Sequence, residues 1–280
     1  MNQPPISFEF FPPKTDKGRE NLAAEQSLIL QQTKPEFFSV TYGAGGSTRQ
    51  PTVETVLNTI KHTQVPTAPH LSCIGDSKSD IHDLLTRYQD EGIRRIVALR
   101  GDLPSGVGFG RGELPFARDL VAYIRETTGD HFTIEVAGYP EVHPEAESAT
   151  SDLMHLKEKV DAGADSIITQ YFFNIDAYVD FLNRAEQIGI TAPIVPGIMP
   201  ITNYEKLARF SSACGADIPR WLEKRLQAFG DDAASLQDFG LEVVARLCEQ
   251  LLELNLPGLH FYTLNKAQPS LDICKALKLI

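Results

Sequence analysis

The sequence predicts a TIM-like (β/α)8 barrel, and three observations support this. Eight short runs rich in β-branched and aromatic residues recur along the 280 residues, and segments with helical spacing of apolar side chains separate them. No linker, low-complexity tract or break in composition divides the chain, so residues 1–280 are expected to form one domain. Strands that alternate with helices over roughly 250 residues are typical of the barrel, with a doubly wound open sheet as the alternative. The count of eight favours the barrel.

The predicted strands follow in chain order, each bounded by glycine, proline or polar turn residues. They cover residues 7–11, 37–43, 68–73, 95–102, 133–139, 166–173, 192–199 and 259–265. Between them the helical pattern is clearest over residues 81–88, 153–160 and 233–254.

Helix ends are marked by caps and turns. Ser79 and Asn203 are expected N-caps, and Glu91-Gly92 is expected to end a helix. Between Tyr204 and Phe229 two helical segments take the place of one, and Pro219 stands at the start of the second. The barrel is therefore expected to carry an added helix before its last strand.

The charge of the chain excludes several classes of function. The formal net charge is -11 and no run of basic residues occurs, which argues against binding to nucleic acid or to an anionic membrane. No apolar stretch approaches the roughly 20 residues that span a bilayer, and the first residues lack the pattern of a signal peptide. We therefore expect a cytoplasmic protein with a small-molecule partner.

Cysteine and histidine spacing predicts no metal site. Cys73, Cys214, Cys248 and Cys274 are dispersed without a C-x-x-C pair, and the seven histidines include no H-E-x-x-H motif. We interpret the cysteines as reduced structural thiols.

Alternate residues of a barrel strand point into the barrel, and this alternation places polar side chains inside. Phe8 and Phe10 are expected to face the helices, which leaves Glu9 inside. Each such residue alone is more simply a core or rim residue, but together they indicate an active-site mouth at the carboxyl ends of the strands. The other strands contribute Thr41, His70, Glu135, Tyr139 and Gln170 to this set.

The fourth strand and the loop after it carry two further expectations. Val97 and Leu99 are expected to face the helices, which leaves Arg100 and then Asp102 inside. The loop G-V-G-F-G-R-G at residues 106–112 lacks the G-x-G-x-x-G spacing of a dinucleotide fingerprint. We interpret it as a lid or a segment beside a cofactor.

Several long motifs follow one another nearly from end to end: S-F-E-F-F-P-P, S-V-T-Y-G-A, A-P-H-L-S-C-I, I-V-A-L-R-G-D, Y-P-E-V-H-P-E-A, K-V-D-A-G-A-D, I-T-Q-Y-F-F, P-G-I-M-P and H-F-Y-T-L-N-K-A. In sequence and order they resemble those of the bacterial-type methylenetetrahydrofolate reductases. The resemblance implies a single barrel that holds FAD at the carboxyl ends of its strands without a Rossmann domain.

The resemblance also implies an activity, the reduction of 5,10-methylenetetrahydrofolate to 5-methyltetrahydrofolate for methionine synthesis. NAD(P)H, in bacterial relatives usually NADH, reduces FAD and leaves before the folate binds, so the reaction is ping-pong. The folate ring must be protonated at its leaving nitrogen before it opens, and Glu9 resembles the family's general acid. Its aromatic surroundings are expected to raise its pKa by desolvation and to keep it protonated near neutrality. The family further suggests a homo-oligomer.

Matching motifs assign the other site residues by resemblance. Asp102 resembles a carboxylate beside the flavin that also contacts the pterin, and Gln170 resembles a side chain shared by folate and nicotinamide. Tyr262 and Lys266 resemble contacts of the folate tail. The implied cofactor contacts, among which Thr41 lies close to the nicotinamide, are Thr41, His70, Arg100, Gly101, Asp102, Phe116, Ala117, Tyr139, His143, Ala146, Asp152, His155 and Lys159.

Four positions depart from the family pattern. Phe116 stands where tyrosine is common, and Lys266 stands where arginine is common. His155 and Glu158 replace an expected asparagine and arginine, and a glutamate is a poor partner for a diphosphate.

Three other functions are weighed against this one. A barrel lyase or aldolase without flavin needs a Schiff-base lysine or a metal at the mouth, and no inward lysine is evident on the strands. A proline-dehydrogenase-like barrel would share the fold and the cofactor. A non-catalytic folate-binding protein would have no need for both Glu9 and Asp102.

Overall fold

The computed structural model describes residues 3–42, 49–101 and 112–280, with the side chain at position 49 excepted. In chain order the elements are β1 (Ile6–Phe10), α1 (Asp16–Gln32), β2 (Phe37–Val40), α2 (Arg49–Thr63), β3 (Thr67–Ser72), α3 (Lys78–Asp90), β4 (Arg95–Leu99), α4 (Ala117–Thr128), β5 (Thr133–Gly138), α5 (Ala149–Asp161), β6 (Ser166–Thr169), α6 (Ile175–Gln187), β7 (Ile194–Val195), β8 (Gly197–Ile198), α7 (Tyr204–Cys214), α8 (Arg220–Ala228), α9 (Ala233–Leu252), β9 (Leu259–Tyr262) and α10 (Ala267–Ala276).

A nine-stranded parallel sheet forms the barrel, in the order β7-β6-β5-β4-β3-β2-β1-β9-β8. The two outer strands of this order, β7 and β8, are consecutive in the chain and are separated by Pro196. Proline has no N–H to give to a strand ladder, so it divides one predicted strand into two. Because β7 pairs with β6 and β8 pairs with β9, this divided segment closes the barrel. The (β/α)8 prediction is confirmed, with its seventh strand in two pieces.

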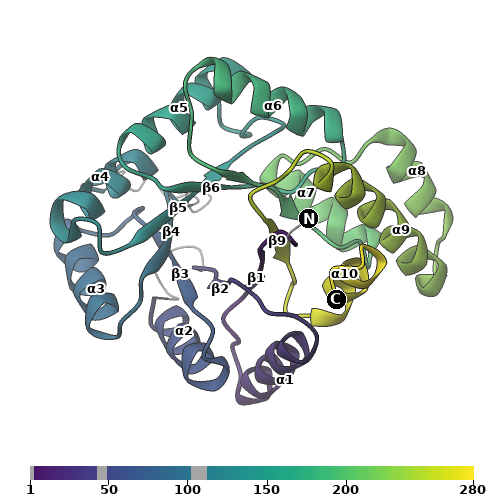
Figure 1. Ribbon diagram of the computed structural model, residues 1–280, viewed down its shortest axis with the longest axis horizontal. Helices are drawn as coiled ribbons and strands as arrows, with labels where there is room; N and C mark the ends of the chain where they lie inside the picture. Colours follow the sequence, from purple (N-terminus) through teal and green to yellow (C-terminus); the bar gives the residue numbers. More distant parts are fainter. Residues whose placement is uncertain (1–2, 43–48, 102–111) are drawn as a thin grey trace.

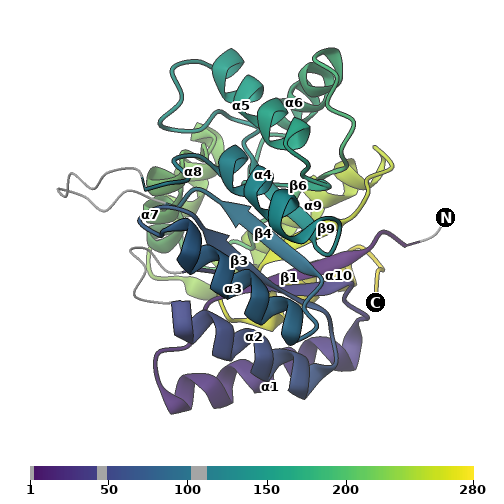
Figure 2. The same ribbon diagram turned by 90° about the vertical axis from the view of Figure 1, so that its left-hand side faces the viewer.

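The helices surround the sheet, and both chain ends lie on one side of the barrel (Figures 1 and 2). All pairings are parallel, so the strands that start on this side end on the opposite side. Three helices, α7, α8 and α9, follow β8 before β9. The added helix is confirmed, and α8 begins directly after Pro219 as predicted.

One of the two predicted helix caps is confirmed. Asn203 caps α7, where its side chain accepts a hydrogen bond from the Lys206 N–H at 2.9 Å. The prediction of Ser79 as a cap is wrong, because α3 begins at Lys78 and Ser77 is its cap. Ser77 and Asp80 form a capping box, in which each side chain accepts from the backbone N–H of the other residue.

Apolar side chains form two clusters, one on each side of the sheet. The larger cluster lies between the strands and the helices and includes Phe8 and Phe10, as predicted. The smaller cluster lies inside the barrel. It consists of Phe37, Ala68, Val97 and Ile168, with Leu99 packed against it.

The predicted orientation of β4 is wrong by one residue. Val97 and Leu99 belong to the inner cluster, whereas Ile96 and Ala98 are fully buried toward the helices. The sequence I-V-A-L is apolar at four successive positions, so alternation of polarity cannot assign its faces.

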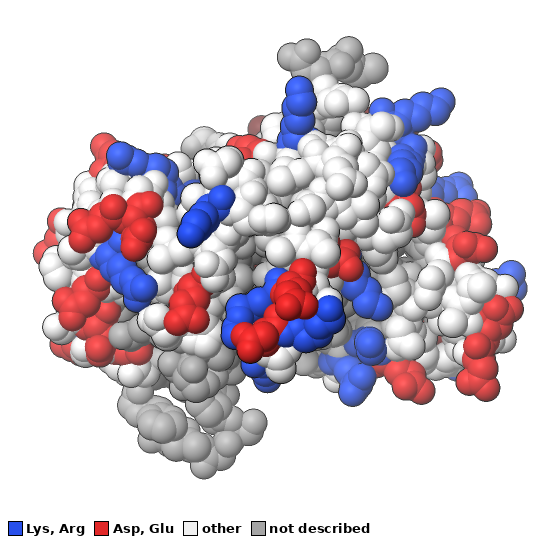
Figure 3. Space-filling model, turned by 90° about the horizontal axis from the view of Figure 1, so that it is seen from below, with Lys and Arg blue, Asp and Glu red and all other residues white. Residues whose placement is uncertain are grey.

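Charged groups of both signs are interspersed on the face that Figure 3 shows. Over the described residues, no helix combines the length and the apolar character that crossing a membrane would require.

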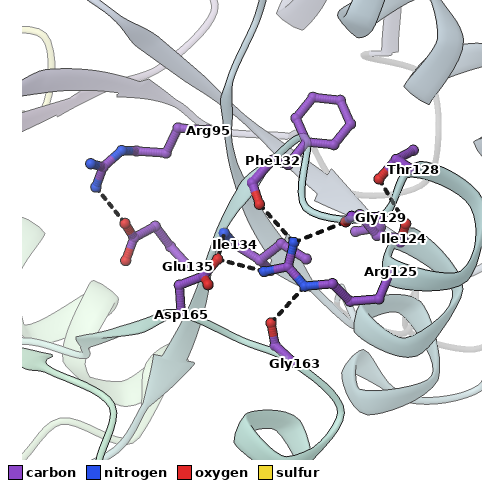
Figure 4. A network of polar contacts seen from close by, with 10 residues as sticks. All are labelled: Arg95, Ile124, Arg125, Thr128, Gly129, Phe132, Ile134, Glu135, Gly163 and Asp165. Carbon is purple, nitrogen blue, oxygen red and sulfur yellow. Dashed lines mark hydrogen bonds and ion pairs between the residues drawn. The ribbon is translucent and has the colours of Figure 1, made fainter.

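A half-buried arginine joins three segments on the outside of the barrel (Figure 4). Arg125, in the last turn of α4, contacts the Asp165 carboxylate at 2.6 Å and donates to the carbonyl oxygens of Gly129, Phe132 and Gly163. Asp165 also accepts from the Ile134 N–H at 2.6 Å. This network ties the end of α4 to the start of β5 and to the turn before β6.

Candidate active site

A cavity of about 530 Å³ lies at the carboxyl ends of the strands, where barrel enzymes carry their chemistry. The loops and first turns that follow the strands supply part of its wall. The structure brings together most of the predicted site residues on this wall: Glu9, Thr41, His70, Arg100, Gly101, Ala117, Tyr139, His143, Lys159, Gln170 and Tyr262.

Glu9 lies on β1 with two imidazoles facing its carboxyl group. Its Oε2 atom is 3.1 Å from Nε2 of His70 on β3 and 3.6 Å from Nε2 of His260 on β9. The Ser39 hydroxyl lies 3.5 Å from the same oxygen. On the far side of His260, Nδ1 is 2.7 Å from the Ser7 hydroxyl. Only 11% of the Glu9 side chain is exposed, so these contacts dominate its environment.

The expectation that Glu9 is protonated near neutrality is wrong for this structure. Burial does act to raise its pKa, but His70 and His260 act against it and lower the pKa from 4.5 to about 2. Glu9 is therefore ionised at neutral pH.

Arg100 lies at the mouth with Gly101, while Asp102 lies outside the described residues. The Arg100 guanidinium is paired with the Glu145 carboxylate at 2.7 Å. Gly101 adopts a φ of +88°, and a Cβ atom there would come within 2.0 Å of the Ser72 hydroxyl oxygen. The turn after β4 therefore requires glycine at this position.

A buried lysine forms another part of the wall. Lys159 on α5 donates a hydrogen bond to the Ala137 carbonyl oxygen at 2.6 Å. Desolvation lowers its pKa from 10.5 to about 8, although Asp152 opposes the shift. Strand alternation cannot place this lysine in the mouth, because Lys159 lies on a helix.

The segment after β5 is held by local hydrogen bonds. The His143 N–H donates to the Asp152 carboxylate at 2.9 Å, and the His143 ring packs edge-on against Tyr139 with centroids 4.6 Å apart. Burial is the largest influence on the His143 pKa and lowers it. Asp152 thus fixes the backbone of His143, a residue of the cavity wall, without lining the cavity itself.

Gln170 and Tyr262 lie on neighbouring parts of the wall. The Tyr262 hydroxyl donates to the Thr169 carbonyl oxygen at 2.7 Å, next to Gln170 in the chain. A Cβ atom at Gly197 would come within 2.1 Å of that oxygen and 2.5 Å of the Tyr262 ring. Glycine at 197 therefore permits the close approach that fixes Tyr262.

Five predicted residues do not line the cavity: Phe116, Ala146, Asp152, His155 and Lys266. His155 and Lys266 are exposed. The Phe116 N–H donates to Asp119 at the start of α4, and the Arg118 guanidinium lies 4.8 Å over the Phe116 ring. Arg118 also forms an ion pair with Glu158, so the unexpected glutamate has a cationic partner from α4.

Sequence reasoning missed His260, Ser7 and Ser39 beside Glu9. The signal was present, because Leu259 and Phe261 are apolar neighbours whose burial toward the helices turns His260 inward. It also missed the wall formed by the α7 residues Phe210, Ala213 and Cys214. Nothing in strand alternation could reveal that wall, because it depends on how a helix packs over the mouth.

The fold and the site together define an α/β-barrel protein whose mouth carries a buried acid with two imidazole partners, an arrangement suited to proton transfer. A family model described as "Methylenetetrahydrofolate reductase" matches residues 1–278. The chain belongs to the methylenetetrahydrofolate reductase family.

Relatives in bacteria and plants are similar over nearly the whole chain. The chain is 40% identical over 272 residues to the 5,10-methylenetetrahydrofolate reductase of Escherichia coli, which covers 97% of this chain and 90% of that protein. It is 41% identical over 292 residues to the Arabidopsis thaliana protein named methylenetetrahydrofolate reductase (NADH) 1, covering 100% of this chain and 49% of that protein. The chain thus spans about half the length of this plant relative.

A solved structure shares the fold at low sequence identity. It is described as an uncharacterized protein from Clostridium thermocellum that binds two copies of 5-methyl-5,6,7,8-tetrahydrofolic acid. The two chains align with a TM-score of 0.71 at 16% identity, over 99% of this chain and 96% of the other.

Proposed function

We propose that this protein reduces 5,10-methylenetetrahydrofolate to 5-methyltetrahydrofolate, with FAD as cofactor and NADH as the expected electron donor. The observation that carries the proposal is Glu9, buried at the cavity wall with the Nε2 atoms of His70 and His260 at 3.1 and 3.6 Å. Family membership supplies the reaction, and this cluster supplies a group that can move a proton at the reacting centre.

The residues of the mouth have the chemistry that FAD requires. Arg100, Lys159 and the N-terminus of α4 at Ala117 would hold the anionic diphosphate, because cations and free helix N–H groups bind phosphates. Tyr139, His143 and His70 would pack against the remainder of the cofactor. When bound, FAD supplies hydride transfer. The Glu145 carboxylate now on Arg100 would have to yield its place to the diphosphate.

Glu9 would protonate the leaving nitrogen of the folate ring so that the ring can open. Because the carboxyl group is ionised in the free protein, it would have to gain a proton before it can act as the acid. His70, whose Nε2 atom lies 3.1 Å from the carboxyl oxygen, is the nearest imidazole that would pass a proton to Glu9. Gln170 and Tyr262 would orient the substrate on the same wall.

We further propose a ping-pong order, which is what a single cavity shared by both substrates would impose. NADH would bind, react and leave before the folate enters the same space. The plant relative's name, which specifies NADH, supports this donor over NADPH. The family relationship also supports a cytoplasmic homo-oligomer that contributes to methionine synthesis.

One anaerobic experiment tests the function. The purified protein should be yellow with about one FAD per chain, and after photoreduction its flavin absorbance should return when 5,10-methylenetetrahydrofolate is added. Addition of 5-methyltetrahydrofolate, which cannot accept the hydride, should leave the flavin reduced. A folded protein that takes up no FAD, or a reduced flavin that the folate does not reoxidise, would overturn the proposal.

A further inference from the structure

Below the active-site mouth, the inside of the barrel contains a second buried carboxyl group. Glu135 on β5 is 1% exposed, and its Oε1 atom lies 2.5 Å from a guanidinium nitrogen of Arg95 on β4. The two side chains point toward each other in Figure 4. Burial raises the Glu135 pKa, whereas Arg95, Ser166 and His260 act to lower it. Glu135 therefore lies within electrostatic reach of the imidazole that faces Glu9.

Arg95 begins β4, at the end of the barrel opposite the mouth. It also contacts the half-exposed Glu36 carboxylate at 3.1 Å. Its guanidinium lies over the Phe37 ring, with the central carbon 4.3 Å from the ring centroid. Phe37 in turn stacks on His260, with centroids 5.8 Å apart and ring planes at 23°. A continuous stack thus runs from Arg95 through Phe37 to His260.

His260 is fully buried and receives groups from several strands. Ser7 and Glu9 face it from β1, Phe37 from β2 and His70 from β3 through the shared Glu9 oxygen. Glu135 on β5 interacts with it electrostatically, Arg95 on β4 reaches it through the Phe37 ring, and the Tyr262 ring is 5.4 Å away on its own strand. Two buried carboxyl groups, those of Glu9 and Glu135, therefore interact electrostatically with this imidazole.

We propose that Arg95 is a positioning residue for the cluster of Glu9, His70 and His260. It binds the Glu135 carboxylate inside the barrel, and it packs against Phe37, which stacks on His260. With Glu135 paired to Arg95, the carboxylate partner of His260 is Glu9 alone. The proposal rests on the proposed function only in naming Glu9 as the acid.

Loss of the Arg95 charge should raise the proton affinity of His260. Without a cation beside it, the Glu135 carboxylate has His260 as its remaining positive partner, so the imidazole should bind its proton more tightly. Removal of both the Arg95 and the Glu135 charge should return the proton affinity of His260 to that of the parental protein. Arg95→Met keeps the apolar contact with Phe37, and Arg95→Met/Glu135→Gln additionally avoids an unpaired buried carboxylate that could hinder folding.

The test uses ¹⁵N-histidine NMR of the protein as purified across pH, with the His260 signal assigned from its loss in His260→Asn. In Arg95→Met the apparent midpoint of the His260 titration should rise by roughly 1 pH unit. The double variant should return it to the parental value, as should Arg95→Lys. The matched control is Arg94→Met. Arg94 directly precedes Arg95, is exposed and contacts His131.

Kinetics provide the second measurement. The pH profile of flavin reoxidation by the folate should shift with the NMR midpoint in Arg95→Met, while flavin reduction by NADH keeps its profile. An unchanged His260 titration in Arg95→Met, or a double variant that behaves like the single one, would overturn the proposal. The NMR measurement needs no folate, so its outcome is separate from any failure of the proposed reaction.

Discussion

At the scale of single residues, the ionisation of Glu9 depends on partners that are distant in sequence. The aromatic neighbours in S-F-E-F-F correctly predict that it is buried, but they predict the wrong direction for its pKa. Burial does raise the pKa, yet the two imidazoles outweigh it and bring the value to about 2. One of them comes from β9, which pairs with β1 only in the closed barrel.

Replacement of Glu9 by glutamine should separate the two halves of the reaction. Glu9→Gln keeps the shape of the side chain but removes the group that carries the proton. Flavin reoxidation by the folate should slow by roughly 10²–10⁴-fold, as is typical for a lost general acid, while flavin reduction by NADH should change little. Stopped-flow absorbance of each half-reaction measures both rates.

The control for this variant is Glu20→Gln, whose carboxyl group is exposed on α1. It should leave both rates unchanged. If Glu9→Gln slowed both half-reactions equally, Glu9 would be a structural residue of the barrel and not its acid.

At the scale of elements, the sequence predicts strands and helices well but places their ends and faces less well. β1, the second half of β3 and the first half of β5 alternate between apolar and polar residues, so their inner side chains follow from the sequence. β4 is apolar throughout its middle, and only packing against Phe37 and Ile168 assigns Val97 to the inside. The α3 cap shows the same limit, because Ser77 and Ser79 differ only in whether Asp80 lies at the right spacing.

Contacts of the segments that connect the elements also stabilise the barrel, and replacement of Arg125 measures how much they contribute to the free energy of unfolding. Arg125→Met would remove four contacts, to Gly129, Phe132, Gly163 and Asp165, and leave the Asp165 carboxylate without its cation. Asp165 is partly exposed, which limits the cost, so the free energy of unfolding should fall by roughly 2 kcal/mol. Urea denaturation followed by circular dichroism measures this change.

Arg209→Met is the matched control for Arg125, because Arg209 is exposed on α7. Its effect on the free energy of unfolding should stay within about 0.5 kcal/mol. Equal effects of the two variants would mean that the Arg125 network contributes nothing specific to stability.

At the scale of the whole molecule, the buried Glu9 cluster links stability to pH. The pKa of Glu9 is about 2 in the folded protein and 4.5 in the unfolded reference, so ionised Glu9 stabilises the folded state above pH 4.5. That stabilisation is lost as the pH falls from 4.5 toward 2. The stability difference between the parental protein and Glu9→Gln should therefore narrow by up to about 3 kcal/mol across this window.

Urea denaturation at a series of pH values between 6 and the acid limit of folding would measure this difference. Glu20→Gln should show no such trend. A difference between parental protein and Glu9→Gln that stays constant down to the acid limit would contradict the lowered pKa.

The architecture of the whole barrel could be predicted because its evidence is local. Alternating strands, helices and turn residues give the fold class, and strand alternation gives Glu9, His70, Tyr139 and Gln170 on one mouth. The partners of Glu9 and the α7 wall depend on closure and helix packing, which bring together residues from opposite ends of the chain. Asp102 lies outside the described residues, so its role stays a prediction.

The pairing of β1 with β9 gives the acid site a particular order of assembly during synthesis. During synthesis Glu9 leaves the ribosome among the first residues and His260 among the last. Pro196, whose carbonyl oxygen accepts from the His260 N–H at 3.1 Å, leaves it between the two. Until β9 emerges, the carboxyl group of Glu9 has no second imidazole, and the edge of β1 remains open to other strands. The pairing of β9 with β1 is therefore also the step that brings His260 to Glu9, and a nascent chain stalled before residue 259 would expose the unpaired edge of β1 to the chaperones of the cell.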